Sequence, residues 1–325
     1  TIVTQNNTET NNINNDNHNN NNNNNSVKDD FIATGEYTGT YWPTESWKTC
    51  SPESVNVNSS QLMEAYSYAA NSSLNTFGFL VIKDGYIIGE SYFDEYNKSS
   101  KFLSYSMAKG FTSALIGIAI DQGYISNTDE YVYHHFDQWN DLNDDDARKK
   151  ITIEHLLTVT SGLSWWEAWD ENYNMINDAF QMGFSGDSVN YVLNKEIVNE
   201  PGTVFNYSTG DPALLSGVIK SATGKHALDY AEEVIFSKIG ITGAEWTNED
   251  SGYTTTYANM NMTLRDYARF GYLFLNNGLW DNEQIVPETW VEKSVDSHKG
   301  LSSHYGYLWW TNLRDYFNDT ESIIP

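Results

Sequence analysis

The chain has 325 residues, of which 39% are hydrophobic and 14% aromatic, so it can bury a sizeable core in one large domain or two interleaved ones. Its 44 acidic residues outnumber its 18 basic ones, and the formal net charge is −26. This charge argues against nucleic acid and anionic membrane surfaces as partners, because both bind basic faces. The single cysteine, Cys50, excludes a disulfide within the chain. No apolar run reaches the roughly 18 residues that a membrane-spanning helix needs.

The N-terminal segment differs in composition from the rest of the chain. Residues 6–25 are almost all Asn, Thr and Asp, which cannot bury apolar surface, so we expect residues 1–30 to form a disordered tail. The chain begins at Thr1 with neither a Met nor the basic and apolar regions of a signal peptide. A polar tether after a mature N-terminus suits an exported protein, whether periplasmic, tethered to the envelope or extracellular.

Globular patterning begins after this tail. In chain order, its first part predicts a helix over 61–70, strands over 76–82 and 86–93, and an apolar helix over 106–122. The turn sequence Lys83-Asp-Gly85 joins the two strands into a β-hairpin. Gly123 closes the apolar helix.

Residues 134–260 are predicted to be mainly helical. Helices are expected over 153–159, 188–194, 211–222 and 227–235, with a further helix over 263–276 and a strand over 305–311. The order of hairpin, helix, long helical insertion and strand is not the βαβα alternation of a parallel sheet. We therefore predict an α+β fold with an antiparallel sheet flanked by helices. Residues 31–133 and 261–325 would form the sheet domain, and residues 134–260 an inserted helical subdomain.

A serine and a lysine at the start of the 106–122 helix are the first candidate for chemistry. Ser106 stands three residues before Lys109, so on a helix the two side chains share one face and can touch. A serine hydroxyl is a weak nucleophile until a base takes its proton, and a lysine amine held out of water can be that base. The pair alone is weakly specific, because a chain of this length contains roughly one such spacing by chance.

Four further segments give the pair its context. They are Ile151-Thr-Ile-Glu-His-Leu-Leu-Thr-Val-Thr-Ser-Gly-Leu163, Pro201-Gly-Thr-Val-Phe-Asn-Tyr207-Ser, Met262-Thr-Leu-Arg-Asp-Tyr-Ala-Arg-Phe-Gly271 and Tyr305-Gly-Tyr-Leu-Trp-Trp310. Together with Ser106-Met-Ala-Lys109, and in this order, they resemble the serine β-lactamase-related superfamily. The nearest branch holds class C β-lactamases, family VIII-type carboxylesterases, D-amino-acid peptidases and 6-aminohexanoate-dimer hydrolases.

The resemblance implies a β-lactamase/transpeptidase-like fold and acyl transfer through a covalent serine ester. Ser106 would attack a carbonyl, while Lys109 and Tyr207 would share the general-base and general-acid work. The backbone N–H of Ser106 would form half of an oxyanion hole.

The sequence also departs from the family pattern. The third motif, a Lys- or His-led triplet ending in Gly, is expected after the 305–311 strand, so we expect it and the closing strands to lie beyond Pro325. His304-Tyr-Gly306 has a similar outline but lies on the wrong side of that strand. Thr209 is expected to bind substrate, but it occupies a position where class C β-lactamases have Asn, and the loss of the carboxamide argues against efficient β-lactam hydrolysis. Trp165 and Trp166 are placed in the wall of the acyl pocket, with core positions as the alternative.

These features predict a serine hydrolase that acts through an acyl-enzyme on small esters or amides. A β-lactamase or D-amino-acid peptidase acting on cell-wall-like substrates is one alternative, and an idle relative that binds peptidoglycan or a partner is another. No cofactor or metal is expected, because the acidic loop 141–145 is not followed by the Gly and bidentate Glu of a calcium loop. The oligomeric state is left open. Few of the basic residues are Arg and there are only 6 prolines, which indicates cold adaptation.

Overall fold

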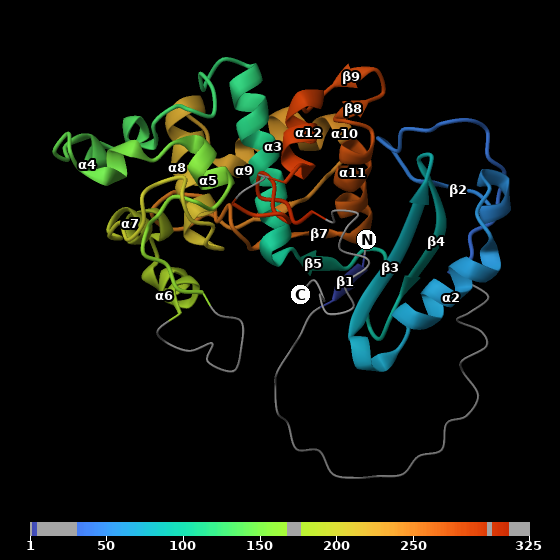
Figure 1. Cartoon of the computed structure of the whole chain (residues 1–325). Helices are drawn as coiled ribbons and strands as arrows, with labels where there is room; N and C mark the ends of the chain where they lie inside the picture. The colour runs from blue at the N-terminus through green and yellow to red at the C-terminus, as the bar shows by residue number, and fades with distance from the viewer. Residues whose placement is uncertain (1, 5–30, 168–176, 298–300, 312–325) are drawn as a thin grey trace, which may run out of the picture. The chain divides into compact units, whose positions relative to one another are not determined.

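The computed structural model of the chain describes residues 2–4, 31–167, 177–297 and 301–311 (Figure 1). The chain divides into two units. Unit 1 comprises Thr1–Phe102, Lys238–Gly243 and Met262–Asn276, and unit 2 comprises Leu103–Ser237, Ala244–Asn261 and Asn277–Pro325. Both units contain helices and small, mainly antiparallel sheets, which confirms the α+β prediction.

Unit 1 is built on a four-stranded sheet. Its strands, in the order β1-β3-β4-β2, are β1 (Ile2–Thr4), β3 (Thr76–Lys83), β4 (Tyr86–Tyr92) and β2 (Lys48–Thr49). The antiparallel β3–β4 pair is the predicted hairpin, and it closes through Asp84 and Gly85, both at positive φ, as a tight two-residue turn requires. A Cβ at Gly85 would lie 1.7 Å from the carbonyl oxygen of Tyr41, so only glycine fits there. Ile2–Thr4 pairs with β3, residues 5–30 lie outside the described part, and the disordered tail over 1–30 stays a prediction.

Unit 1 also contains helices, among them η1 (Pro52–Val55), α2 (Ser59–Ala69), η2 (Ser72–Leu74) and α11 (Leu264–Leu275). Of these, α2 and α11 pack against β3. The helix α2 lies alongside the hairpin (Figure 1) and confirms the helix expected over 61–70. The ring of Phe31 stacks on Tyr66 of α2 and on Phe79 of β3, at centroid distances of 4.5 and 5.4 Å.

Unit 2 is mainly helical. Its helices are η3 (Tyr105–Met107), α3 (Ala108–Asp121), η4 (Val132–His135), α4 (Asp137–Asn140), η5 (Ala147–Lys150), α5 (Ile153–Leu157), α6 (Asp178–Ser185), α7 (Ser188–Leu193), α8 (Gly210–Thr223), α9 (Ala227–Ala231), η6 (Glu232–Phe236) and α12 (Glu288–Val295), and its short strands include β6 (Glu245–Trp246), β8 (Leu279–Trp280) and β9 (Glu283–Gln284). The chain passes between the units within β5 (Lys101–Leu103), α10 (Ser237–Ile239) and β7 (Met260–Thr263). The helix α3 is buried from Ala108 to Ala119 and packs against α8, α9 and α12. Gly117 allows the close approach of α12, since a Cβ there would lie 2.4 Å from the Trp290 ring.

Two details differ from the sequence-based expectations. Residues 305–311 were expected to form a strand, but only Tyr305 and Trp310 pair, in a single bridge. The segment folds back on itself because Leu308 has a φ of 62° and the Gly306 N–H donates to the carbonyl of Trp309 at 2.8 Å. The unit boundaries also differ from the domain boundaries predicted at residues 133/134 and 260/261, which stay a prediction. Within the described segments, no helix is both long and apolar enough to cross a bilayer.

Candidate active site

Ser106 lies on a strained turn at the start of the most buried helix of unit 2. It sits in the short helix η3, immediately before α3, and is half-buried. The preceding residue, Tyr105, has a φ of 44°, which is uncommon for a side chain of this size. Ser104 fixes this turn, because its N–H donates to the carbonyl of Met260 at 2.8 Å and its Oγ accepts the Met260 N–H at 3.2 Å. Two hydrogen bonds to the backbone of Met260 therefore hold the turn that precedes Ser106.

Lys109 is buried in the first turn of α3, with 1% of its surface exposed. Its Nζ donates to Ser106 Oγ at 2.8 Å, to the carbonyl of Tyr257 at 3.2 Å and to Thr209 Oγ1 at 3.3 Å. These three oxygens match the three hydrogens of an ammonium group. All three are uncharged, so the buried amine has neutral acceptors and no carboxylate among its hydrogen-bond partners in the described structure.

Tyr207 approaches the same serine oxygen from a different segment. Its hydroxyl donates to Ser106 Oγ at 3.0 Å, and its ring stacks on Trp310 at a centroid distance of 5.5 Å. The backbone before it is fixed by the linking segment, because the carbonyl of Val159 accepts the Asn206 N–H at 3.0 Å. Val159 has a φ of 49°, an outlier for a β-branched residue. The residue that fixes the backbone before Tyr207 is therefore itself in a strained conformation. The structure thus brings the three predicted catalytic side chains together at Ser106 Oγ.

Thr209 is bound to a carboxylate that our sequence analysis missed. The Thr209 hydroxyl donates to Glu167 Oε1 at 2.7 Å, and the Thr209 N–H donates to Glu167 Oε2 at 2.8 Å. The indole N–H of Trp165 also donates to Glu167 Oε2 at 2.8 Å. The only signal in the sequence is a carboxylate that directly follows the Trp pair.

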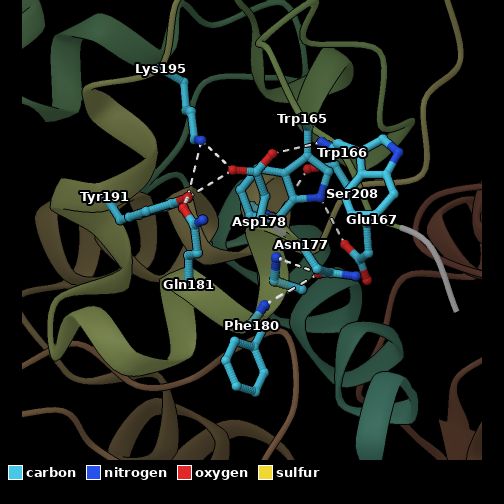
Figure 2. A network of polar contacts seen from close by, with 12 residues as sticks. Trp165, Trp166, Glu167, Asn177, Asp178, Phe180, Gln181, Tyr191, Lys195 and Ser208 are labelled. Carbon is cyan, nitrogen blue, oxygen red and sulfur yellow. Dashed lines mark hydrogen bonds and ion pairs between the residues drawn. The ribbon is translucent and has the colours of Figure 1, made fainter. Parts of the chain in front are cut away.

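The segment that carries Glu167 is tied to the start of α6 (Figure 2). The Trp166 N–H donates to Asp178 Oδ2 at 2.7 Å, and the Asp178 N–H donates to the carbonyl of Trp166 at 2.9 Å. The other carboxylate oxygen of Asp178 accepts the Tyr191 hydroxyl at 2.7 Å and pairs with Lys195. Asp178 therefore joins this segment to α7 and the residues after it.

A second carboxylate, Asp211, lies in the first turn of α8, two residues after Thr209. It is 1% exposed, and burial raises the pKa of its carboxyl to about 7. Its Oδ1 accepts the Ser161 hydroxyl at 2.8 Å, whereas Oδ2 has no hydrogen-bond partner among the described residues. The ordinary pKa of an aspartate is near 4, so Asp211 is partly protonated at neutral pH.

A cavity of about 570 Å³ opens beside Ser106 and Lys109. One wall is α6, with Phe180 and Phe184 in contact at a centroid distance of 4.6 Å, and Thr209 also lines the cavity. Trp165 and Trp166 are not among its lining residues in the described structure. Trp165 packs over Gly210, where a Cβ would lie 2.6 Å from its ring, and Trp166 is 41% exposed. Their placement in the pocket wall stays a prediction, and sequence reasoning missed Phe180, Phe184 and the carbonyl of Tyr257.

Comparison with known proteins identifies the family. Residues 62–317 match the Beta-lactamase family, so the chain belongs to that family. Its fold is the β-lactamase/transpeptidase-like fold that the sequence predicted.

Individual relatives are distant and have several described activities. A Bacillus anthracis structure described as "Putative 6-aminohexanoate-dimer hydrolase" is 26% identical, with a TM-score of 0.61, and the match covers 72% of this chain and 64% of that one. The 6-aminohexanoate-dimer hydrolase of Paenarthrobacter ureafaciens is 20% identical over 67% of this chain and 56% of its own length. EstCE1, a hydrolase with promiscuous acyltransferase activity, is 15% identical, with a TM-score of 0.60, over 77% of this chain and 82% of that one. The chain thus spans only about 56–64% of the two 6-aminohexanoate-dimer hydrolase relatives.

Proposed function

We propose that the protein is a serine hydrolase that acts through an acyl-enzyme on small esters or amides. The observation that carries this proposal is the convergence of Lys109 Nζ and Tyr207 Oη on Ser106 Oγ, at 2.8 and 3.0 Å. A nucleophile within hydrogen-bond reach of a base and of a second proton carrier is the arrangement that covalent acyl transfer needs.

The two proton carriers divide the reaction between them. As Ser106 Oγ bonds to the acyl carbon, its proton passes to the neutral amine of Lys109. The bond to the leaving group then breaks, and the Tyr207 hydroxyl gives its proton to the departing alcohol or amine. In the second half, the Tyr207 phenolate takes a proton from water as that water attacks the ester. The Lys109 ammonium returns a proton to Ser106 Oγ as the acid leaves, so the enzyme is restored.

The cavity supports a small acyl donor with an apolar part. Its volume of about 570 Å³ lies in the range typical of small-molecule sites. The aromatic pair Phe180 and Phe184 offers apolar contact beside the reacting atoms, while Asn248 and Asn259 add polar groups to the lining. Esters and amides of moderate size match this lining.

The alternatives are less well supported by the site. The hydroxyl of Thr209 donates its hydrogen to Glu167, so it cannot donate this hydrogen to a substrate amide. The Asn expected at this position in class C β-lactamases contacts the substrate amide. This difference disfavours a β-lactamase or D-amino-acid peptidase. An idle binding protein would not need the amine and phenol that meet at Ser106.

Covalent labelling tests the proposal. A fluorophosphonate should add once per chain to the wild-type protein and not to Ser106→Ala, and nitrophenyl esters should be turned over by the wild type alone. The panel should include amide dimers, a chromogenic cephalosporin and D-Ala dipeptides, because preferred turnover of either of the last two would favour the alternative. Labelling that persists in Ser106→Ala would overturn the assignment of the nucleophile.

A further inference from the structure

We propose that Glu167 is a positioning residue that, acting through Thr209, aims the lone pair of Lys109 at Ser106. The inference rests on the proposed function, since it concerns the amine that takes the serine proton. In the described structure, Glu167 is not among the residues that line the cavity and its hydrogen bonds go to Trp165 and Thr209, so its effect on the site passes through Thr209.

The first step is the direction of the hydrogen bond between Glu167 and Thr209. A carboxylate only accepts hydrogen bonds. Glu167 uses one oxygen for the Thr209 hydroxyl, at 2.7 Å, and the other for the Thr209 N–H, at 2.8 Å. The hydroxyl hydrogen of Thr209 is therefore held on the side of Glu167.

The second step concerns the surroundings of the Lys109 amine. With its hydrogen held by Glu167, Thr209 Oγ1 can only accept from Nζ, at 3.3 Å. The carbonyl of Tyr257, at 3.2 Å, can also only accept. A neutral amine has two hydrogens and one lone pair, and these two acceptors take both hydrogens. The lone pair then points at the third partner, Ser106 Oγ, at 2.8 Å. In this orientation it can accept the serine proton.

The third step is that Glu167 is itself held in one orientation. Its Oε2 also accepts the Trp165 indole at 2.8 Å, and the next residue back, Trp166, is bound to Asp178 through two hydrogen bonds. Without the carboxylate, the Thr209 hydroxyl would be free to rotate and to donate to the Lys109 lone pair. The amine would then lose the orientation in which it can deprotonate Ser106.

Glu167→Gln is the sharpest test because it keeps the size of the side chain and reverses one hydrogen bond. The amide oxygen should stay with the N–H donors of Thr209 and Trp165, so the amide NH₂ donates to Thr209 Oγ1. The Thr209 hydroxyl must then donate toward Lys109. We expect kcat for a nitrophenyl ester to fall about 10- to 100-fold with little change in KM, since general-base catalysis contributes about 10²–10⁴-fold.

Variants of Thr209 separate this role from a structural one. Thr209→Ser keeps the hydroxyl and should retain activity within about threefold, whereas Thr209→Val should lose about as much as Glu167→Gln. Glu167→Gln should add little to Thr209→Val, because the double variant has no hydroxyl to reverse. Glu130→Gln is the matched control, as it removes another half-buried carboxylate of unit 2, one bound to His135 at 2.9 Å, and should leave kcat and KM unchanged.

The outcomes distinguish this inference from the proposed function. Wild-type protein that no phosphonate labels would remove the proposed function. Normal labelling with an unchanged kcat in Glu167→Gln would overturn the role of Glu167 alone, as would fully additive losses with Thr209→Val. If Glu167→Gln does not fold, equal activities of Thr209→Ser and Thr209→Val would overturn the role of Glu167.

Discussion

Two sites of the molecule, one in each unit, hold buried or half-buried cations in opposite ways. In unit 1, Arg265 and Arg269 of α11 both bond to carboxylates, Arg265 to Glu90 through two bonds of 2.7 and 2.6 Å and Arg269 to Asp266 at 2.7 Å. In unit 2, Lys109 has only uncharged oxygens as bonding partners. A guanidinium paired with a carboxylate stays charged and stabilises the fold, whereas an amine among neutral oxygens can give up its proton.

The comparison predicts that Lys109→Arg has the largest effect on activity. Arginine keeps the positive charge but cannot act as a base near neutral pH. We expect kcat/KM for a nitrophenyl ester to fall by about 10³–10⁴-fold, nearly as far as in Lys109→Ala. The melting curve checks that the fold survives. An active Lys109→Arg enzyme would show that the charge of this residue, and not its ability to accept a proton, is what the site uses.

Tyr207→Phe should have the next largest effect. It removes one hydroxyl and the 3.0 Å bond to Ser106 Oγ, while the ring can keep its stacking on Trp310. We expect a loss of about 10²–10³-fold in kcat. Combination with Lys109→Arg should be little worse than Lys109→Arg alone, because the two groups act in one proton circuit. Steady-state kinetics on the two single variants and the double variant would test this. Additive losses would place the two groups in separate steps.

The residues that meet at Ser106 were largely predictable from the sequence, and the residues that orient them were not. Ser106 and Lys109 are one helical turn apart, and Tyr207 lies in a segment with a recognisable pattern. Glu167 and Thr209 are 42 positions apart in the chain, and no local sequence pattern predicts a contact at that distance.

The same distinction between local and long-range information applies to the fold. The hairpin was predictable because Asp84 and Gly85 are turn residues with the required φ. The segment 305–311 was misassigned as a strand because its reversal depends on a positive φ at Leu308, a residue type that does not favour it. Export and cold adaptation stay predictions, and a melting temperature above about 70 °C would contradict the latter.

Asp211 extends the comparison to a buried anion in unit 2 that has no cationic partner in its hydrogen bonds. Its pKa is raised to about 7 by burial, so the folded state holds this proton more tightly than the unfolded chain, where the pKa is near 4. The contribution of this proton to stability is fully present below pH 4 and is lost as the pH rises through about 7. The loss should reach up to about 4 kcal/mol, since each pKa unit corresponds to about 1.4 kcal/mol.

Denaturant titrations at pH 5 and pH 8 would measure the larger part of this loss, about 2–3 kcal/mol, because the first part is already lost between pH 4 and pH 5. Asp211→Asn cannot ionise, and its amide oxygen can still accept the Ser161 hydroxyl, so the variant should lack this part of the pH dependence. If the free energy of unfolding changes equally between pH 5 and pH 8 in wild type and variant, Asp211 does not titrate in this range.

The smallest expected effect comes from Arg265→Lys, the reverse of the swap at Lys109. Lysine keeps the charge but cannot form both bonds to Glu90, and the side chain of Arg265 is 29% exposed, so solvent screens part of the change. We expect the free energy of unfolding to fall by about 1 kcal/mol, measured by chemical denaturation, with kcat/KM unchanged. Exchanging the two cation types would thus remove activity in unit 2 and only a little stability in unit 1. A loss of activity at constant stability in Arg265→Lys would mean that this ion pair serves the reaction, and the contrast between structural and chemical cations would no longer hold.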